Sequence, residues 1–271
     1  MADRDRGHAQ FSISETMDEL VRTAATGIVQ AARSAVAARG AFSIALSGGS
    51  TPRLLYQFLA TPAVAAETPW KDIQVFWGDE RHVPPDHPDS NYRMVRGALL
   101  DHVPVPEKNI HRIKGELPEA DATALAYEIE LRRIFGLDGG ESAEGPVALP
   151  RFDLILLGMG EDGHTASLFP HSPALAERKA LVVANPVEKL GTTRITLTVP
   201  IINNAARVWF LIAGGSKAHV LKDVLEGPYQ PDLLPSQLIN PTDGNLTFLL
   251  DNAAAAELSP RFRENTLAGI G

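Results

Sequence analysis

The sequence contains no cysteine in its 271 residues. This absence excludes disulfide bonds, zinc sites built on thiolates, iron–sulfur clusters and a cysteine nucleophile. Aromatic residues make up only 6% of the chain, but hydrophobic residues reach 44% and charged residues 21%, which is typical of a folded globular protein. A chain of this length buries enough surface on folding to form a core without covalent cross-links.

Positive charge is also scarce. There are 25 Lys and Arg residues against 33 Asp and Glu, which gives a net charge of −8. This balance argues against general binding to nucleic acids or anionic membranes, because no excess of cations is available to meet phosphates. No apolar run reaches the roughly 18–20 residues that a membrane span needs, and residues 1–8 are mostly polar and charged. We therefore expect a soluble cytoplasmic protein.

The apolar pattern switches repeatedly between a helical and an extended period. One helical face runs from Met17 to Ala32, with Ser12 and Glu15 spaced as a capping box and Gly40 at the end of the helix. Strands that alternate with helices predict an α/β fold with a mostly parallel sheet, helices on both faces and a ligand site at the carboxyl ends of the strands. The predicted strands are 42–46, 73–77, 152–157, 181–184, 208–213 and 246–250, and the other predicted helices are 52–60, 92–101, 120–135 and 217–225.

Only residues 138–150 have the composition of a linker, with Gly, Ser, Glu and Pro. Strands of the same kind are predicted on both sides of this stretch, so we interpret it as a surface loop. The chain shows no repeat at a fixed period and no low-complexity tract. We therefore predict a single Rossmann-like domain over residues 1–271.

A glycine-rich segment at 47–51 joins a predicted strand to a predicted helix. Its glycines allow a ligand to approach the backbone closely, and the free N–H groups of Gly49, Ser50 and Thr51 would face a bound anion at the start of the helix. Alternatively, Ser50 or Thr51 caps the helix and the glycines serve only the turn. The loop alone leaves both interpretations open.

Acidic and basic residues follow the next predicted strand, at 79–82. The two acids and Arg81 would orient a base or bind an anion there, or they would form a solvated turn with a weak local ion pair. His82, Asp86 and His87 suggest a metal site, but their spacing matches no recognisable ligand pattern. We therefore predict no bound metal.

Gly158, Gly160 and Gly163 spell G-x-G-x-x-G directly after another predicted strand. A dinucleotide site requires this pattern to open a long helix and an acidic residue to end the next strand. Here Pro170 interrupts the run within two turns, and the next strand ends at Asn185. NAD binding is therefore rejected.

The histidine in this turn carries more information than its glycines. His164 is the only one of the eight histidines that is flanked by glycine and acid immediately after a buried strand, and Asp162 can fix its tautomer. The alternative is a histidine that caps a short helix or donates to a backbone carbonyl. Farther along, Arg194 and Lys217 lie at predicted strand exits, opposite the glycine-rich helix start, and together fit one bound phosphate.

Several of these segments, in this order, resemble the 6-phosphogluconolactonase family, and the likeness runs from about Phe42 to the last predicted strand. The run from Gly158 to Pro170, which contains D-G-H-T-A-S-L-F-P, is long and specific. The resemblance implies a fold shared with glucosamine-6-phosphate deaminases. It also implies hydrolysis of 6-phosphoglucono-δ-lactone to 6-phosphogluconate in the pentose phosphate pathway, without metal or organic cofactor. We expect a phosphorylated sugar lactone as the small-molecule partner of a monomer or small homo-oligomer.

The resemblance also assigns roles to residues. His164 resembles the general base and Asp162 the acid that supports it, although Asp79 is an open alternative for that support. Deaminase relatives carry Glu where this chain has Phe169, and a phenyl ring cannot transfer a proton, so the departure favours a lactonase. The residues predicted to bind the substrate and its phosphate are Ser47, Gly48, Gly49, Ser50, Thr51, Asp79, Arg81, Gly163, Arg194 and Lys217.

Two alternative functions remain at this stage. One is an isomerase or deaminase that acts on amino-sugar phosphates, which Phe169 disfavours. The other is a non-catalytic sugar-phosphate sensor of the kind found in transcriptional regulators. Such a sensor needs a helix-turn-helix to read DNA, and only one helix is predicted before the first strand.

Overall fold

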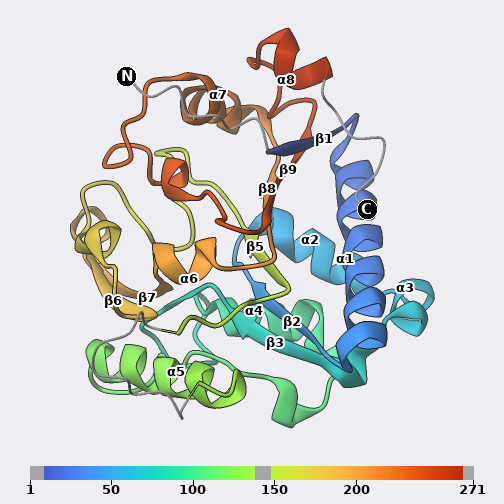
Figure 1. Ribbon diagram of the computed structural model, residues 1–271, viewed down its shortest axis with the longest axis vertical. Helices are drawn as coiled ribbons and strands as arrows, with labels where there is room; N and C mark the ends of the chain where they lie inside the picture. Colours follow the sequence, from blue (N-terminus) through green and yellow to red (C-terminus); the bar gives the residue numbers. More distant parts are fainter. Residues whose placement is uncertain (1–8, 138–147, 265–271) are drawn as a thin grey trace.

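A six-stranded parallel sheet forms the centre of the computed structural model, which describes residues 9–137 and 148–264 (Figure 1). The strand order is β1-β9-β8-β5-β2-β3. The predicted α/β fold with a mostly parallel sheet is confirmed. The strands of this sheet are β1 (Gln10–Ser14), β2 (Phe42–Leu46), β3 (Ile73–Trp77), β5 (Leu154–Leu157), β8 (Arg207–Ile212) and β9 (Asn245–Asp251).

The long helix α1 (Met17–Arg39) packs against β1, β2 and β9, and α2 (Ser50–Leu59) packs between α1 and α4 (Asn91–Ala98). Gly40 ends α1 as predicted, because its left-handed backbone (φ 78°) lets its N–H bond the carbonyl of Val36. The other helices are α3 (Pro62–Glu67), α5 (Ala120–Ile134), α6 (Val199–Asn203), α7 (Ala218–Glu226) and α8 (Pro260–Glu264).

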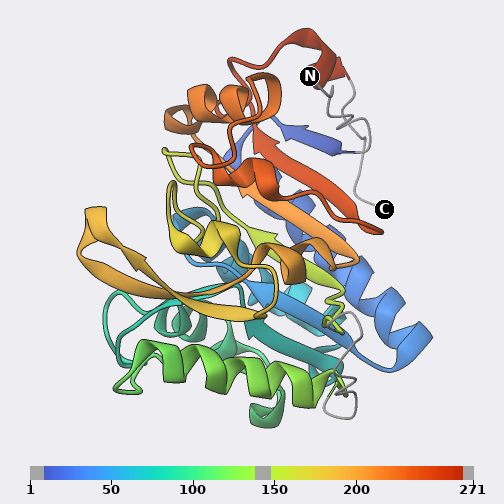
Figure 2. The ribbon, with the colours of Figure 1, turned by 60° about the vertical axis from the view of Figure 1, so that its left-hand side comes forward.

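A second, smaller sheet was not predicted. It is antiparallel, has the order β4-β7-β6, and consists of β4 (Asp79–Arg81), β6 (Val182–Val187) and β7 (Thr192–Leu197). Figure 2 shows β6 and β7 as a projecting hairpin with α5 beside it, and α5 contacts both strands. Placing Arg194 at a strand exit was therefore wrong, because Arg194 lies inside β7 opposite Arg81 of β4.

The start of α1 also differs from the prediction. Ser12 belongs to β1, which pairs with β9, so it does not cap the helix. The cap is Thr16, whose hydroxyl accepts the N–H of Glu19 at 3.2 Å, while the Glu19 carboxylate accepts the N–H of Glu15 at 2.7 Å. The arrangement resembles a capping box four residues later than expected, except that the Glu19 carboxylate accepts the N–H of Glu15 and not that of the N-cap Thr16.

Two buried tyrosines hold the ends of neighbouring strands. The hydroxyl of Tyr56 in α2 accepts the N–H of Ser47 at 3.0 Å and donates to its carbonyl at 2.8 Å, just beyond β2. The hydroxyl of Tyr127 in α5 makes the same pair of bonds with Trp77, the last residue of β3, at 2.9 and 3.0 Å. Since β3 is an edge strand, Tyr127 satisfies backbone groups that have no neighbouring strand.

The strand ends meet at one side of the sheet. Strands β8, β5, β2 and β3 are neighbours and run parallel, so the segments that follow them converge. These segments contain the residues that the sequence analysis selected after each strand. The fold thus explains why residues from distant parts of the chain share one site.

Some predictions concern parts of the chain that the structure does not describe. Most of the predicted loop at 138–150 lies outside the described residues, and the single domain over residues 1–271 stays a prediction. Among the described helices, none combines the length and the apolar character that crossing a membrane requires. The cytoplasmic location also stays a prediction.

We expect Tyr56→Phe and Tyr127→Phe each to lower the free energy of unfolding by about 1–3 kcal/mol, because each leaves two buried backbone groups without a partner. Urea titration followed by tryptophan fluorescence measures this change. Tyr92→Phe is the matched control, since no hydrogen bond among the described residues uses the Tyr92 hydroxyl and its ring packs edge-on against Trp77. Equal stability of all three variants would refute the role of the two hydroxyls.

Candidate active site

A cavity of about 760 Å³ lies where the strand ends converge. It is lined by residues that follow β2, β3, β5 and β8, together with Arg194 of β7. Every predicted site residue lines it except Gly163, whose carbonyl instead accepts bonds from the N–H and hydroxyl of Ser236. The predicted residues that line the cavity are Ser47, Gly48, Gly49, Ser50, Thr51, Asp79, Arg81, Asp162, His164, Arg194 and Lys217.

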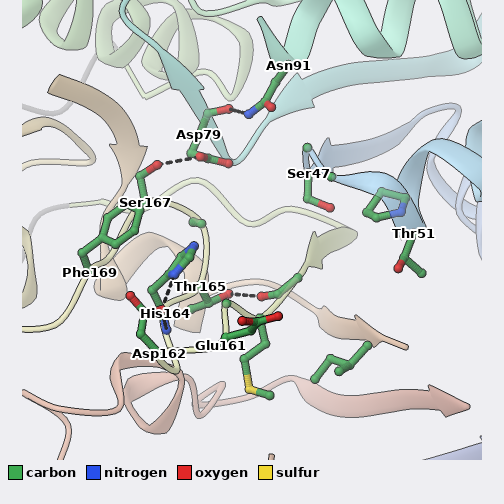
Figure 3. A pocket seen from close by; sticks show the side chains of 18 of the residues that line it. Ser47, Thr51, Asp79, Asn91, Glu161, Asp162, His164, Thr165, Ser167 and Phe169 are labelled. Atoms are coloured by element: carbon green, nitrogen blue, oxygen red, sulfur yellow. Dashed lines mark hydrogen bonds and ion pairs between the residues drawn. The ribbon is translucent and has the colours of Figure 1, made fainter. Parts of the chain in front are cut away.

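His164 and Asp162 form a close pair in this cavity (Figure 3). The Nδ1 atom of His164 lies 2.5 Å from Oδ1 of Asp162, which also accepts the His164 backbone N–H at 3.2 Å. A carboxylate oxygen only accepts, so Nδ1 carries the proton and Nε2 keeps a free lone pair. Within the described part of the chain, no hydrogen bond joins Asp79 to this ring. Its Oδ2 accepts the hydroxyl of Ser167 at 2.6 Å.

The loop around His164 is shaped for its ring. The Gly160 N–H donates to the His164 carbonyl at 2.8 Å, and an added Cβ at Gly160 would overlap the imidazole. On its other side the imidazole stacks on Phe169, with ring centres 4.1 Å apart. Glycine at position 160 and the phenyl ring at 169 together fix where the histidine points.

Burial lowers the pKa of His164 from 6.5 to about 4. The negative charge of Asp79 opposes this shift, whereas Lys217, Arg194 and Arg81 add to it. The imidazole is therefore neutral at neutral pH, which a base requires. Lys217, Arg194 and Arg81 are therefore all close enough to His164 to change its pKa.

Two of these cations face each other across neighbouring strands. Arg81 of β4 is paired with Arg194 of β7 in the small sheet, and like charges at such positions repel. Burial lowers the pKa of Arg194, and the charge of Arg81 lowers it further. The buried Nε of Arg194 has no hydrogen-bond partner among the described residues. An anion bound between them would supply both the missing acceptor and the missing negative charge.

The opposite wall adds donors. Helix α2 begins at Ser50, and its N-cap residue Gly49 gives no side-chain cap. Gly49, Ser50 and Thr51 line the cavity, so the first turn of the helix offers N–H donors to an anion there. The buried hydroxyl of Ser47 has no partner within the described part of the chain. Gly48 lies so close to Asn91 that an added Cβ would overlap its side chain, so glycine is required there. Lys217 ends the short turn η6 (Gly215–Lys217) and also lines the cavity. Arg81, Arg194 and Lys217 together form the cationic region of the site.

Sequence analysis missed Asn91 and Ser167 as parts of the site, and it considered Glu80 only as a group that orients a base or binds an anion. Asn91 donates to the Asp79 carbonyl at 2.9 Å, and Ser167 holds the Asp79 carboxylate. Buried Glu80 anchors both the strand and the helix α4, because its carboxylate accepts the backbone N–H groups of Arg81, Asn91 and Tyr92. These contacts join residues from different segments and belong to no recognisable sequence motif. The spacing of residues in the sequence therefore gave no signal for them.

The two histidines that suggested a metal site, His82 and His87, form hydrogen bonds with the backbone instead. Nε2 of His82 lies 2.7 Å from the carbonyl of Leu117, and Nδ1 of His87 accepts the Asp89 N–H at 3.1 Å. Within residues 9–137 and 148–264 there is no group of three or more His, Asp or Glu side chains placed to hold a metal ion.

Comparison with known proteins places the chain in a family. The sequence model described as "Glucosamine-6-phosphate isomerases/6-phosphogluconolactonase" matches residues 15–248. The chain belongs to this family. The 6-phosphogluconolactonase of Synechocystis is 47% identical over 226 residues, which cover 83% of this chain and 88% of that protein. That of Mycobacterium tuberculosis is 39% identical over 255 residues, 92% of this chain and 98% of the relative.

Solved structures agree with this membership of the glucosamine-6-phosphate isomerase/6-phosphogluconolactonase family. The 6-phosphogluconolactonase from Trypanosoma cruzi matches with a TM-score of 0.80 at 32% identity, over 93% of this chain and 97% of that one. A monomeric glucosamine-6-phosphate deaminase matches with a TM-score of 0.74 at 20% identity, over 92% and 99%, which is a likeness of fold alone. The resemblance to 6-phosphogluconolactonases stated from the sequence motifs is confirmed.

We expect inorganic phosphate to bind the cationic region, and Arg194→Met and Lys217→Met each to weaken it by about tenfold or more, the scale of one lost charged hydrogen bond. Isothermal titration calorimetry measures the affinity. Lys222→Met, an exposed lysine on α7, is the matched control. Unchanged affinity in both cavity variants would remove these two residues from the anion site.

Proposed function

We propose that the protein hydrolyses 6-phospho-D-glucono-1,5-lactone to 6-phospho-D-gluconate. The observation that carries this proposal is a neutral histidine, oriented by Asp162, that shares one cavity with a region of unsatisfied anion-binding groups. A phosphorylated lactone has both parts that such a cavity needs, an anion for the cationic region and an electrophilic carbonyl for the base.

The substrate phosphate binds among Arg81, Arg194, Lys217 and the start of α2. Because the protein carries a net charge of −8, this local group of cations attracts the anionic substrate. In Figure 3, Ser47 and Thr51 lie apart from His164 and Asp162, so the two groups of residues are available to different parts of one substrate. Anchoring the phosphate at one end holds the lactone carbonyl near His164 at the other.

In the first step, Nε2 of His164 takes a proton from a water molecule as the water attacks C1. Charge develops on the carbonyl oxygen, and backbone N–H groups of the glycine-rich turn stabilise it. The C1–O5 bond then breaks, and the imidazolium of His164 returns its proton to the leaving ring oxygen. The products are a C1 carboxylate, whose proton goes to solvent, and a free hydroxyl at C5.

The residue beside His164 argues for this reaction over deamination. Phe169 stacks on the imidazole at the position where the family resemblance implies Glu in the deaminase relatives, and its ring has no proton to transfer. A ring-opening proton relay through that position is therefore absent from this cavity. The alternative of a non-catalytic sensor is left to the experiment below.

We expect the protein to accelerate hydrolysis of freshly prepared 6-phosphogluconolactone, with EDTA present, above the spontaneous rate. His164→Ala lowers kcat by at least about 100-fold, the range of a lost general base, but leaves phosphate affinity unchanged. Proton release monitored with an indicator measures the rate. His219→Ala, whose side chain is 79% exposed on α7, is the matched control.

Three outcomes would each contradict a part of the proposal. Equal loss of turnover and phosphate affinity in His164→Ala would show that the histidine binds and does not act as a base. No acceleration by the unaltered protein, combined with tight binding of 6-phosphogluconate, would indicate a sensor. Activity that EDTA abolishes would contradict the predicted absence of a metal.

The pH dependence follows from the environment of His164. Burial places its pKa at about 4 in the free protein, and a bound phosphate neutralises nearby cations, so the pKa rises toward 6.5 in the complex. The base is active when unprotonated, so kcat should be constant near neutrality and fall as pH drops. We expect the midpoint of this fall between about 4 and 6.5. A midpoint above 6.5 would mean that nearby negative charge, and not burial, determines the pKa of the His164 imidazole.

A further inference from the structure

Lys189 reaches the active site from an unexpected element. It lies in the short turn η5 (Glu188–Leu190) at the tip of the β6–β7 hairpin, which belongs to the small sheet. Its ammonium group forms an ion pair with Oδ2 of Asp162 and lies 5.0 Å from the centre of the Phe169 ring. The side chain is 50% exposed and lines the cavity. No sequence motif pointed to this residue.

These contacts close a ring of four side chains. Asp162 uses Oδ1 for Nδ1 of His164 and Oδ2 for Lys189. Phe169 stacks one face on the imidazole and lies under the Lys189 ammonium. Lys189 therefore contacts both groups that hold the catalytic histidine, although it does not contact the histidine itself.

The arrangement has two physical consequences. With both oxygens engaged, the Asp162 carboxylate cannot rotate away from Nδ1, so the tautomer of His164 is fixed. The ammonium also compensates the negative charge of Asp162, which would otherwise favour a protonated imidazole. An ion pair at such an exposed position adds little to the stability of the fold. Its main effects are therefore on the orientation of Asp162 and on the charge near the His164 imidazole.

We propose that Lys189 is a positioning residue, which holds Asp162 and Phe169 so that Nε2 of His164 stays unprotonated and directed into the cavity. The proposal rests on the proposed function, because it concerns the base of that reaction. It also makes the tip of the hairpin part of the active site.

Other charges around His164 do not substitute for Lys189. Arg81, Arg194 and Lys217 lie in the cationic region, and Lys217 is within 3.9 Å of the Glu161 carboxylate, whereas Lys189 is paired with the carboxylate that orients the ring. The titratable and charged groups that face His164 from the surrounding elements are Asp79, Arg81, Glu161, Asp162, Lys189, Arg194 and Lys217.

The test compares Lys189→Met, which removes the charge, with Lys189→Arg, which keeps it. Lys179→Met, an exposed lysine in the segment before β6, is the matched control. Proton NMR titration of the His164 imidazole, assigned by its loss in His164→Ala, measures the protonation of the ring without any substrate. Kinetics with 6-phosphogluconolactone give kcat and KM, and thermal unfolding confirms that each variant is folded.

We expect Lys189→Met to raise the pKa of His164 by at least about 0.5 unit, because the Asp162 charge is no longer compensated. Its kcat should fall by about tenfold with little change in KM, since the phosphate site is untouched. In Lys189→Arg, the pKa of His164 and the kcat should both lie close to the values of the unaltered protein. Lys179→Met should match the unaltered protein in both quantities.

Two results would overturn the proposal. One is an unchanged pKa and an unchanged kcat in Lys189→Met. The other is a lower kcat with an unchanged pKa and no recovery in Lys189→Arg, which would mean a merely structural role. An unaltered protein that does not accelerate hydrolysis would refute the proposed function instead, and the NMR titration would still decide whether Lys189 controls the ring.

Discussion

The whole site depends on one constraint of the sheet, which is that four neighbouring strands run parallel and end on the same side. Strands β8, β5, β2 and β3 each deliver a short polar segment to that side. Backbone groups at the strand ends are then held by side chains from the helices, as Tyr56 and Tyr127 do beside β2 and β3. The base and its carboxylate both follow β5 and lie two residues apart, whereas the anion-binding groups come from other strands and meet this pair only through the fold.

The second sheet supplies what the parallel sheet cannot. Its strands bring Arg81 and Arg194 into register, and its hairpin tip brings Lys189 to Asp162. Placing two like charges close together in a partly buried position, as with Arg81 and Arg194, lowers the stability of the folded protein. A protein with a net charge of −8 thereby acquires a local positive potential directed at one position.

Much of this arrangement follows from the sequence by physical reasoning. Continuous apolar runs identified the central strands, because a strand covered on both faces has no polar side, as in Leu154–Leu157. Glycine, acid and histidine directly after such a run identified the loop of His164. The small sheet escaped prediction because β4 has only three residues and β7 begins with polar ones, so neither shows an extended apolar pattern. Strand β1 was missed because two of its five residues are serines whose burial depends on β9. Lys189 was missed because its partners are contributed by another loop.

The pairing of β1 with β9 has a consequence for how the chain is made. These strands join the beginning of the described chain to its end, with Gln10 opposite Thr247, and β1 has no other neighbour in the sheet. During synthesis β1 therefore leaves the ribosome long before its only partner exists, and closing so large a loop is entropically costly and slow. The sheet can grow outward from β2, β3 and β5 while the chain is still being translated, but its outer edge is completed only once β9 has been made. In the interval, the backbone groups of β1 that will pair with β9 have no partner strand.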